Sequence, residues 1–104
     1  MRNNMNIQTF IGCESSFEEA STVLFGIPFD GTTSFRPGTR FAMQAIRQDS
    51  FGLESYSPYL DRDLEEEAIH DGGDLDLPFG NTERVLSDIA TYTKEVLDNG
   101  KKFL

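Results

Sequence analysis

The sequence is short of basic side chains, histidine, cysteine and long apolar runs. Its 104 residues contain nine lysines and arginines against eighteen aspartates and glutamates, a formal charge of −9. Duplex nucleic acid and anionic membranes bind surfaces with a surplus of basic side chains, so neither partner is expected. The longest apolar run, Val23 to Ile27, is far shorter than the roughly 20 residues that cross a bilayer. The amino terminus also lacks the apolar stretch of a secretory signal.

Cysteine and histidine each occur once, and this scarcity excludes several kinds of site. Cys13 cannot close an intrachain disulfide, so we expect a cytoplasmic protein in which Cys13 is small, partly buried and unactivated. With His70 as the only histidine, we expect no Ser/His/Asp or Cys/His catalytic arrangement. No Gly-x-Gly-x-x-Gly follows the first predicted strand, which excludes the fingerprint of a dinucleotide site.

The composition that remains is that of a small folded domain. Hydrophobic residues make up 38% of the chain and include nine phenylalanines, which predicts a packed core. Residues 22–27 are apolar on both faces and are closed by Pro28, as in a strand buried in a parallel sheet. The density of turn-forming residues over 29–38 predicts a loop at the carboxyl end of that strand.

A helix is predicted after this loop, with Thr39 as a possible N-cap. Four apolar residues form its expected core-facing stripe: Phe41, Ala42, Ala45 and Ile46. Three polar residues are expected on its other faces: Arg40, Gln44 and Arg47. Residues 48–60 look irregular because Gly52 and Pro58 interrupt any pattern.

Residues 61–76 carry eight of the eighteen acidic side chains, and a run of this kind is usually a solvated surface. Within it, residues 67–71 predict a short strand that Gly72 and Gly73 stop. Asp74 is expected to accept hydrogen bonds from turn N–H groups beside these glycines. Four residues form the one cluster that suggests a metal ion: His70, Asp71, Asp74 and Asp76. Their spacing fits no known ligand loop, so we interpret them as turn and surface residues.

The clearest helix follows, capped by Asn81 or Thr82 and stopped by Asn99–Gly100. Six residues form its apolar face: Val85, Leu86, Ile89, Tyr92, Val96 and Leu97. Residues 101–104 look like the start of another buried strand. This order predicts an α/β fold with a parallel sheet, in which residues 1–104 are the amino-terminal portion of a single larger domain.

Three ordered motifs make the sequence recognisable: Gly-Ile-Pro-Phe-Asp at 26–30, Phe-Arg-Pro-Gly-Thr-Arg-Phe at 35–41 and Ala-Ile-Arg at 45–47. Phe-Glu-Glu-Ala at 17–20 and Asp-Gly-Gly-Asp at 71–74 agree with them. Over roughly residues 15–104 this pattern resembles the ureohydrolase family, and within it the agmatinase branch rather than the arginases. One departure is Ala42-Met43 where the family usually has Gly-Pro, and we expect it to change only the start of the helix.

The resemblance implies a three-layer α/β/α ureohydrolase (arginase-like) fold, incomplete in this chain. It further implies that a hydroxide bridging two Mn²⁺ ions hydrolyses agmatine to putrescine and urea. The family's Gly-Gly-x-His and Asp-x-His-x-Asp metal segments do not occur in residues 1–104, and the resemblance implies that all of the metal ligands, those of its Asp-x-Asp segment included, lie downstream of Leu104. No catalytic or metal-binding residue is therefore expected in this chain, which should be inactive alone. The family's trimers and hexamers imply a homo-oligomer.

Two other functions stay open beside agmatine hydrolysis. The first is hydrolysis of another guanidino compound, such as guanidinobutyrate, because the substrate-selecting residues of the family lie mostly outside these motifs. The second is a non-catalytic, truncated product that serves assembly or regulation. A small flavodoxin-like binding module is a weaker third hypothesis, since residues 101–104 read as an unfinished strand.

The loop at 29–38 lies where α/β sheets bind ligands, so Asp30, Thr33 and Ser34 are candidates for the rim of a substrate pocket. Arginine is not expected to meet a cationic guanidino substrate. Three arginines are instead interpreted as pairing with carboxylates such as Asp30 or Asp49, or as lying at a subunit contact: Arg36, Arg40 and Arg47.

Overall fold

The structure is a computed structural model of the chain and describes residues 8–29, 38–78 and 80–104. Its main sheet has the order β4-β1-β5, with both pairings parallel. The strands are β1 (Thr22–Gly26), β4 (Ile69–Asp74) and β5 (Lys102–Phe103). The predicted parallel α/β pattern is thereby confirmed. The predicted strand after Gly100 is also present, but its residues are exposed and not buried as predicted.

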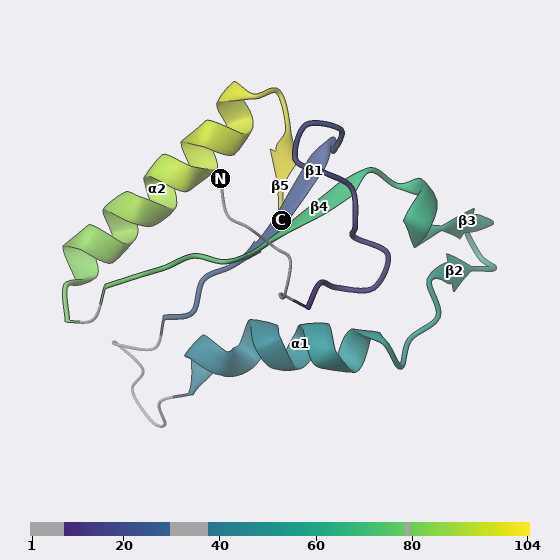
Figure 1. The fold of residues 1–104 in the computed structure, drawn as a ribbon, viewed down its shortest axis with the longest axis horizontal. Coiled ribbons are helices and arrows are strands. Elements are labelled where there is room, and N and C mark those ends of the chain that lie inside the picture. Colours follow the sequence, from purple (N-terminus) through teal and green to yellow (C-terminus); the bar gives the residue numbers. More distant parts are fainter. Residues whose placement is uncertain (1–7, 30–37, 79) are drawn as a thin grey trace.

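Two helices connect these strands and lie on opposite sides of the sheet (Figure 1). Helix α1 (Ala42–Ser50), with a preceding 3-10 turn η1 (Thr39–Phe41), lies between β1 and β4, and α2 (Thr82–Asp98) lies between β4 and β5. The step from β1 to β4 and the step from β4 to β5 run in opposite directions across the sheet. Right-handed crossovers therefore place their helices on opposite faces. This arrangement confirms the three-layer α/β/α fold.

The apolar core lies between β1 and α2. Val23 and Phe25 of β1 pack with Val96 of α2, and Phe17, Leu75 and Tyr92 pack against this cluster. The rings of Phe25 and Tyr92 meet edge to face with their centroids 4.7 Å apart. Alternate residues of a strand face one side of the sheet, which is why Val23 and Phe25 both point to α2.

Most of the prediction for α2 is confirmed. The Asn81 side chain accepts a hydrogen bond from the Arg84 N–H, as an N-cap does, and Gly100 has the left-handed φ of 74° expected after the last turn. Val85 and Val96 are buried, and Ile89 and Tyr92 are half-buried. Leu86 and Leu97 are exposed, however, so the buried stripe is narrower than predicted.

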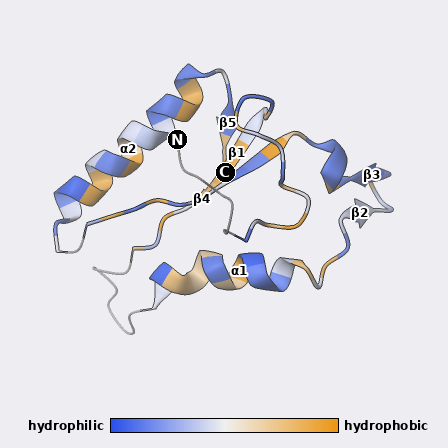
Figure 2. Cartoon of the chain, viewed as in Figure 1, coloured by the Kyte–Doolittle hydropathy of each residue, from blue (hydrophilic) through white to orange (hydrophobic). Residues whose placement is uncertain are grey.

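The predicted core-facing stripe of α1 is wrong. Phe41, Ala42, Ala45 and Ile46 are all exposed, and the side of α1 that meets the sheet carries Met43, Arg47 and Ser50. Figure 2 shows hydrophobic residues on the ribbon of α1. The physical reason is that Arg47 pairs with two carboxylates of β4, and this polar contact fixes which side of the helix faces inward.

The start of α1 also differs from the prediction. Thr39 does not cap the helix, because its hydroxyl donates to the carbonyl of Phe29, 3.1 Å away. Gly38, with a φ of 141°, precedes the first turn instead.

Strand β4 continues through Gly72 and Gly73 instead of stopping at them, so that prediction is wrong. The register with β1 shifts between Leu24↔Asp71 and Gly26↔Asp74, which marks a bulge in β4. Gly73 takes the left-handed φ of 77° that the bulge uses. A Cβ at Gly72 would lie 2.7 Å from the Tyr92 hydroxyl, so glycine here makes room for the core.

The segment between α1 and β4 is more ordered than predicted. Helix α1 extends to Ser50, and β2 (Tyr56–Ser57) pairs antiparallel with β3 (Arg62–Asp63) ahead of a second 3-10 turn, η2 (Leu64–Glu66). The hairpin of β2 and β3 projects away from the main sheet (Figure 1). Among the described helices, none is long and apolar enough to cross a membrane.

Candidate functional site

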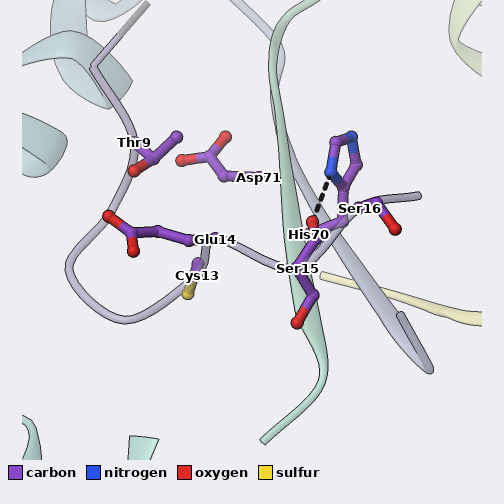
Figure 3. A pocket seen from close by; sticks show the side chains of 7 residues that line it. All are labelled: Thr9, Cys13, Glu14, Ser15, Ser16, His70 and Asp71. Carbon is purple, nitrogen blue, oxygen red and sulfur yellow. Dashed lines mark hydrogen bonds between the residues drawn. The ribbon is translucent and has the colours of Figure 1, made fainter. Parts of the chain in front are cut away.

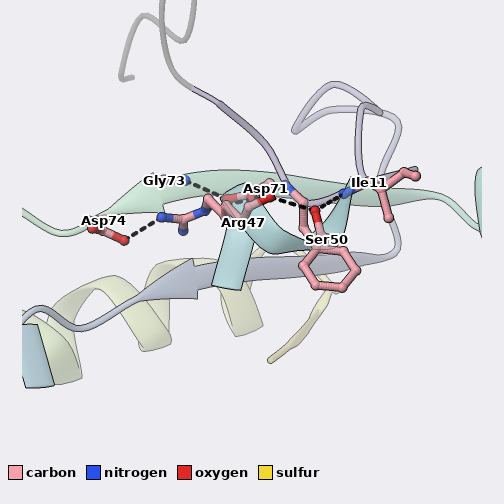
Figure 4. Close-up of polar contacts among 7 residues, drawn as sticks. Ile11, Arg47, Ser50, Asp71, Gly73 and Asp74 are labelled. Carbon is pink, nitrogen blue, oxygen red and sulfur yellow. Dashed lines mark hydrogen bonds and ion pairs between the residues drawn. The ribbon is translucent and has the colours of Figure 1, made fainter. Parts of the chain in front are cut away.

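A buried ion-pair network joins α1 to β4 near the carboxyl ends of β1 and β4 (Figure 4). The Arg47 Nε lies 2.9 Å from Asp71 Oδ2, and the Arg47 Nη1 lies 2.6 Å from Asp74 Oδ1. The side chains of Arg47 and Asp71 are 3% and 0% exposed, and that of Asp74 is 23% exposed. Two charge-assisted hydrogen bonds inside the fold therefore hold the helix to the strand.

Asp71 connects further parts of the chain to this network. Its Oδ2 also accepts a hydrogen bond from the Phe10 N–H at 2.8 Å, and its Oδ1 accepts one from the Gly73 N–H at 2.9 Å. The hydroxyl of Ser50 accepts a hydrogen bond from the Ile11 N–H and donates one to the Arg47 carbonyl. The amino-terminal segment, α1 and the bulge of β4 thus share one carboxylate as their common partner.

The electrostatics of Arg47 follow from these contacts. Burial by itself would lower the pKa of its guanidinium, but hydrogen bonds to Asp71 and Asp74 and their negative charges outweigh burial and raise it. Its Nη2 is buried and has no hydrogen-bond partner among the described residues. The guanidinium is therefore permanently charged and is turned toward β4.

The interpretation of Arg47 as a carboxylate partner is confirmed, although its partners are Asp71 and Asp74. Arg40 lies 4.9 Å over the ring of Phe41. Arg36 lies outside the described residues, as do the candidate rim residues Asp30, Thr33 and Ser34. The network as a unit does not follow from the sequence, where its one signal is Asp71, the charged last residue of the predicted strand 67–71.

The interpretation of the acidic cluster needs two corrections. Asp71 is buried, so it is not a surface residue, because the positive charge of Arg47 compensates its burial. The carboxylate that accepts a bond from the glycine turn is that of Asp71, and Asp74 binds Arg47 instead. The side chain at position 71 reaches the Gly73 N–H because the bulge folds that N–H back toward it.

A shallow pocket of about 360 Å³ lies on the amino-terminal side of β4 (Figure 3). Seven residues line it: Thr9, Cys13, Glu14, Ser15, Ser16, His70 and Asp71. The His70 ring and the Asp71 carboxylate point to opposite sides of β4, and the His70 Nδ1 is 2.9 Å from the Ser15 carbonyl, to which it donates. These side chains therefore do not converge on one point.

Cys13 in this pocket is buried, and its pKa is raised to about 11 by burial first and by the charges of Asp71 and Glu14 second. The thiolate is the nucleophilic form of cysteine, so the thiol is inert at neutral pH. This agrees with the expectation that nothing activates it.

A second, more open pocket of about 260 Å³ lies beyond the end of β4, against α2. Its lining combines carboxylates with apolar side chains: Leu75, Asp76, Leu77, Asp88, Thr91, Tyr92 and Glu95. Asp88 and Glu95 have no signal in the sequence that points to a pocket, because they are ordinary polar positions of the α2 pattern.

A two-manganese centre does not fit the described residues. No group of three or more His, Cys, Asp or Glu side chains is placed to hold a metal ion in the described part of the chain. Asp71 and Asp74 are engaged by Arg47, and the Nδ1 of His70 is engaged by a carbonyl. Arg47, Asp71 and Asp74 instead pair with one another and join α1 to β4 near the strand ends.

Comparisons with known proteins agree with the geometry. The model of the arginase family matches residues 20–104. The agmatinase of Bacillus anthracis is 52% identical over 94 residues, which is 90% of this chain and 32% of that protein. The N(1)-aminopropylagmatine ureohydrolase of Thermococcus kodakarensis is 40% identical over 85 residues, 82% of this chain and 28% of that protein.

The crystal structure of the agmatine ureohydrolase of Thermoplasma volcanium superimposes with a TM-score of 0.87 at 31% identity, covering 95% of this chain and 33% of that one. The chain thus spans about a third of the length of the relatives it matches. A family match over most of the chain, with the same fold in a solved relative, leads to one conclusion. The chain belongs to the arginase family.

Proposed function

We propose that this chain is the amino-terminal part of an agmatinase-type ureohydrolase, which hydrolyses agmatine to putrescine and urea. The observation that carries the proposal is the 52% identity to the Bacillus anthracis agmatinase over 94 residues. The agreement in fold with an agmatine ureohydrolase supports it. Because the chain spans 32% of that agmatinase, the activity is proposed for a complete ureohydrolase domain and not for these residues alone.

The part that we assign to this chain is structural support of the strand ends. Ligand sites of open α/β sheets lie outside the carboxyl ends of the strands, where β1 ends at Gly26 and β4 at Asp74. Arg47 holds Asp74 over Gly26, where a Cβ would overlap the carboxylate. The network thereby sets the path of the chain that leaves each strand.

The resemblance to the family also suggests two Mn²⁺ ions as cofactor. The described residues do not fit such a centre, because Asp71 and Asp74 are engaged by Arg47 and His70 is engaged by a carbonyl. We propose that manganese, if the complete domain uses it, is bound by residues other than those described. We also propose a cytoplasmic homo-oligomer, a trimer or hexamer, for the complete enzyme.

The substrate within the guanidino class is a separate matter. A relative 40% identical to this chain is named for N(1)-aminopropylagmatine, so the matched portion is compatible with more than one guanidino substrate. Guanidinobutyrate hydrolysis is the alternative that agmatine must be tested against. A non-catalytic, truncated product that serves assembly or regulation is the second alternative that the experiment below tests.

Urea release tests the proposal directly. The 104-residue chain, after its intact mass has been confirmed, is mixed with the portion of the Bacillus anthracis agmatinase that it does not match. Urea is measured with Mn²⁺ and agmatine, guanidinobutyrate or arginine, and each polypeptide alone is the control. We expect release from agmatine in the mixture only. An assembled mixture that releases no urea from any of the three compounds would contradict the enzyme proposal and leave the assembly role.

A further inference from the structure

The junction between α2 and β5, residues 99–101, contains the one Asn-Gly pair of the chain, Asn99–Gly100. Glycine has no Cβ, so its backbone nitrogen can approach the side-chain amide of the asparagine before it more closely than any other residue allows. Both residues are exposed at the point where the chain leaves α2 and turns back to β5 (Figure 1). Water therefore reaches both of them.

The reaction open to such a pair is deamidation. The backbone nitrogen of Gly100 gives up its proton and attacks the side-chain Cγ of Asn99. A C–N bond forms, the bond from Cγ to Nδ2 breaks and ammonia leaves, which closes a succinimide ring. Water then opens the ring at either carbonyl. The net change is asparagine plus water to ammonia plus aspartate, or plus isoaspartate when the main chain runs through the former side chain.

The folded junction opposes ring closure in two ways. The Gly100 N–H donates to the Leu97 carbonyl at 2.9 Å, so the nitrogen that must give up its proton is held in a hydrogen bond. Asn99 has a φ of −88° and a ψ of 11°. The ring needs the Gly100 nitrogen on the side of the backbone that carries Cβ, and this ψ directs it away. The junction must therefore open before the reaction can occur.

The bonds that keep the junction closed belong to the last turn of α2 and to Lys101. The Asn99 Nδ2 donates to the Glu95 carbonyl at 2.8 Å, and the Lys101 N–H donates to the Val96 carbonyl at 3.3 Å. The Lys101 Nζ donates to the Ala20 carbonyl at 2.6 Å and so ties the junction to the segment ahead of β1. Helix ends open at a much lower free energy than the whole fold, so the reaction is accessible to the folded chain.

Either product disturbs the end of α2 and the start of β5. Aspartate at position 99 adds a negative charge beside Asp98 at the carboxyl end of α2, where the helix dipole favours positive charge. Isoaspartate also adds a methylene group to the main chain between α2 and β5. This insertion displaces the Lys102 N–H, which donates to the Ser21 carbonyl at 2.9 Å and begins the pairing of β5 with β1.

We propose that Asn99–Gly100 is a site of spontaneous deamidation, gated by opening of the junction, and that its isoaspartyl product loosens β5 from β1. The modification accumulates with the age of the molecule, and it accumulates faster in molecules whose junction opens more often. The inference goes beyond the proposed activity and does not depend on it.

Ageing of the purified chain tests the site and its gate. The chain is incubated at mildly alkaline pH in buffer and in guanidinium chloride, and its peptides are mapped by mass spectrometry for replacement of the side-chain NH2 by OH. We expect product at Asn99 in both solvents, formed at least about tenfold faster in guanidinium chloride. Asn81, which is exposed and followed by threonine, is the internal control and should stay intact in buffer. Absence of product at Asn99 in buffer overturns the site, and equal rates in the two solvents overturn the gate.

Lys101→Ala opens the gate without changing the reacting atoms. Because it removes the bond to the Ala20 carbonyl, product at Asn99 should form about threefold to tenfold faster in buffer and at an unchanged rate in guanidinium chloride. Lys102→Ala is the matched control, since it removes the same charge from the next residue, whose side chain is exposed. Equal rates for the two variants in buffer overturn the gate.

Hydrogen exchange tests the effect on β5. Molecules with isoaspartate at position 99 are separated from the aged chain by chromatography, and exchange at the Lys102 amide should be at least about tenfold faster in them than in the unmodified chain. Asn99→Asp adds the charge without lengthening the main chain, so its increase should be smaller. Unchanged exchange in the isoaspartyl chain, or an equal increase in Asn99→Asp, overturns the effect assigned to isoaspartate.

Discussion

Replacing Arg47 by methionine removes the positive charge from the buried contact between α1 and β4. Methionine keeps much of the aliphatic length of arginine, so packing changes less than charge does. The substitution leaves the carboxylate of Asp71, which is 0% exposed, without its cation, and that of Asp74, which is 23% exposed, partly hydrated. Removing one partner of a buried ion pair typically costs about 3–5 kcal/mol. Most of this loss should come from Asp71, because water can reach Asp74.

Two further variants show how much of this loss in free energy of unfolding comes from each carboxylate. Asp74→Asn keeps an oxygen that can accept from Arg47 Nη1 and should cost about 1–2 kcal/mol. Arg47→Lys keeps the positive charge, but its single ammonium group cannot bond both carboxylates as the guanidinium does. Its cost in free energy of unfolding should therefore lie between the costs of Asp74→Asn and Arg47→Met. The free energy of unfolding of each chain is measured by urea denaturation with circular dichroism. A loss below about 1 kcal/mol for Arg47→Met would refute the view that this network holds α1 to the sheet.

Two other predictions concern buried positions. The pKa of Cys13, raised to about 11 in the fold, lets the unfolded thiol ionise first as the pH rises above about 9. The contribution of this pKa shift to the free energy of unfolding is therefore complete below pH 9, and about 2–3 kcal/mol of it is lost by pH 11. Over this range the free energy of unfolding should fall less for Cys13→Ala than for the unsubstituted chain. An identical slope in both chains would contradict the prediction. Gly26→Ala places a methyl group against the Asp74 carboxylate and 2.9 Å from Met43 Cγ, and it should cost about 1–3 kcal/mol in urea denaturation. Gly52→Ala, where the nearest atom is 3.4 Å away, is the control and should be close to neutral.

The sequence predicts best where structure depends on neighbouring residues. The cap at Asn81, the end at Gly100 and the buried positions Val85 and Val96 of α2 all follow from local pattern, and the structure has them. The pairing of β1 with two parallel strands follows from the order of elements, because crossovers leave few arrangements.

The face of α1 could not be predicted in this way. An apolar stripe at helical spacing normally faces the core, but the inward side of α1 is decided by Asp71 and Asp74, which lie 24 and 27 residues beyond Arg47. No residue close to Arg47 in the sequence indicates that Asp71 and Asp74 are its partners. Likewise, two consecutive glycines normally indicate the end of a strand. Here β4 continues through them, and the Tyr92 hydroxyl occupies the space that a side chain at position 72 would take.

The position of β1 in the middle of the sheet has a consequence for how the chain is made. Strand β1 is synthesised before both of its neighbours. Ser21 at its start contacts Ala68, 47 residues later, and Ala20 contacts Lys101, 81 residues later. At a translation rate of about 5–20 residues per second, roughly 2–9 s pass between the synthesis of β1 and that of β4, and a longer time passes before β5 is made. During that interval its apolar residues have no partner strand, so nascent β1 is a segment that a chaperone can bind.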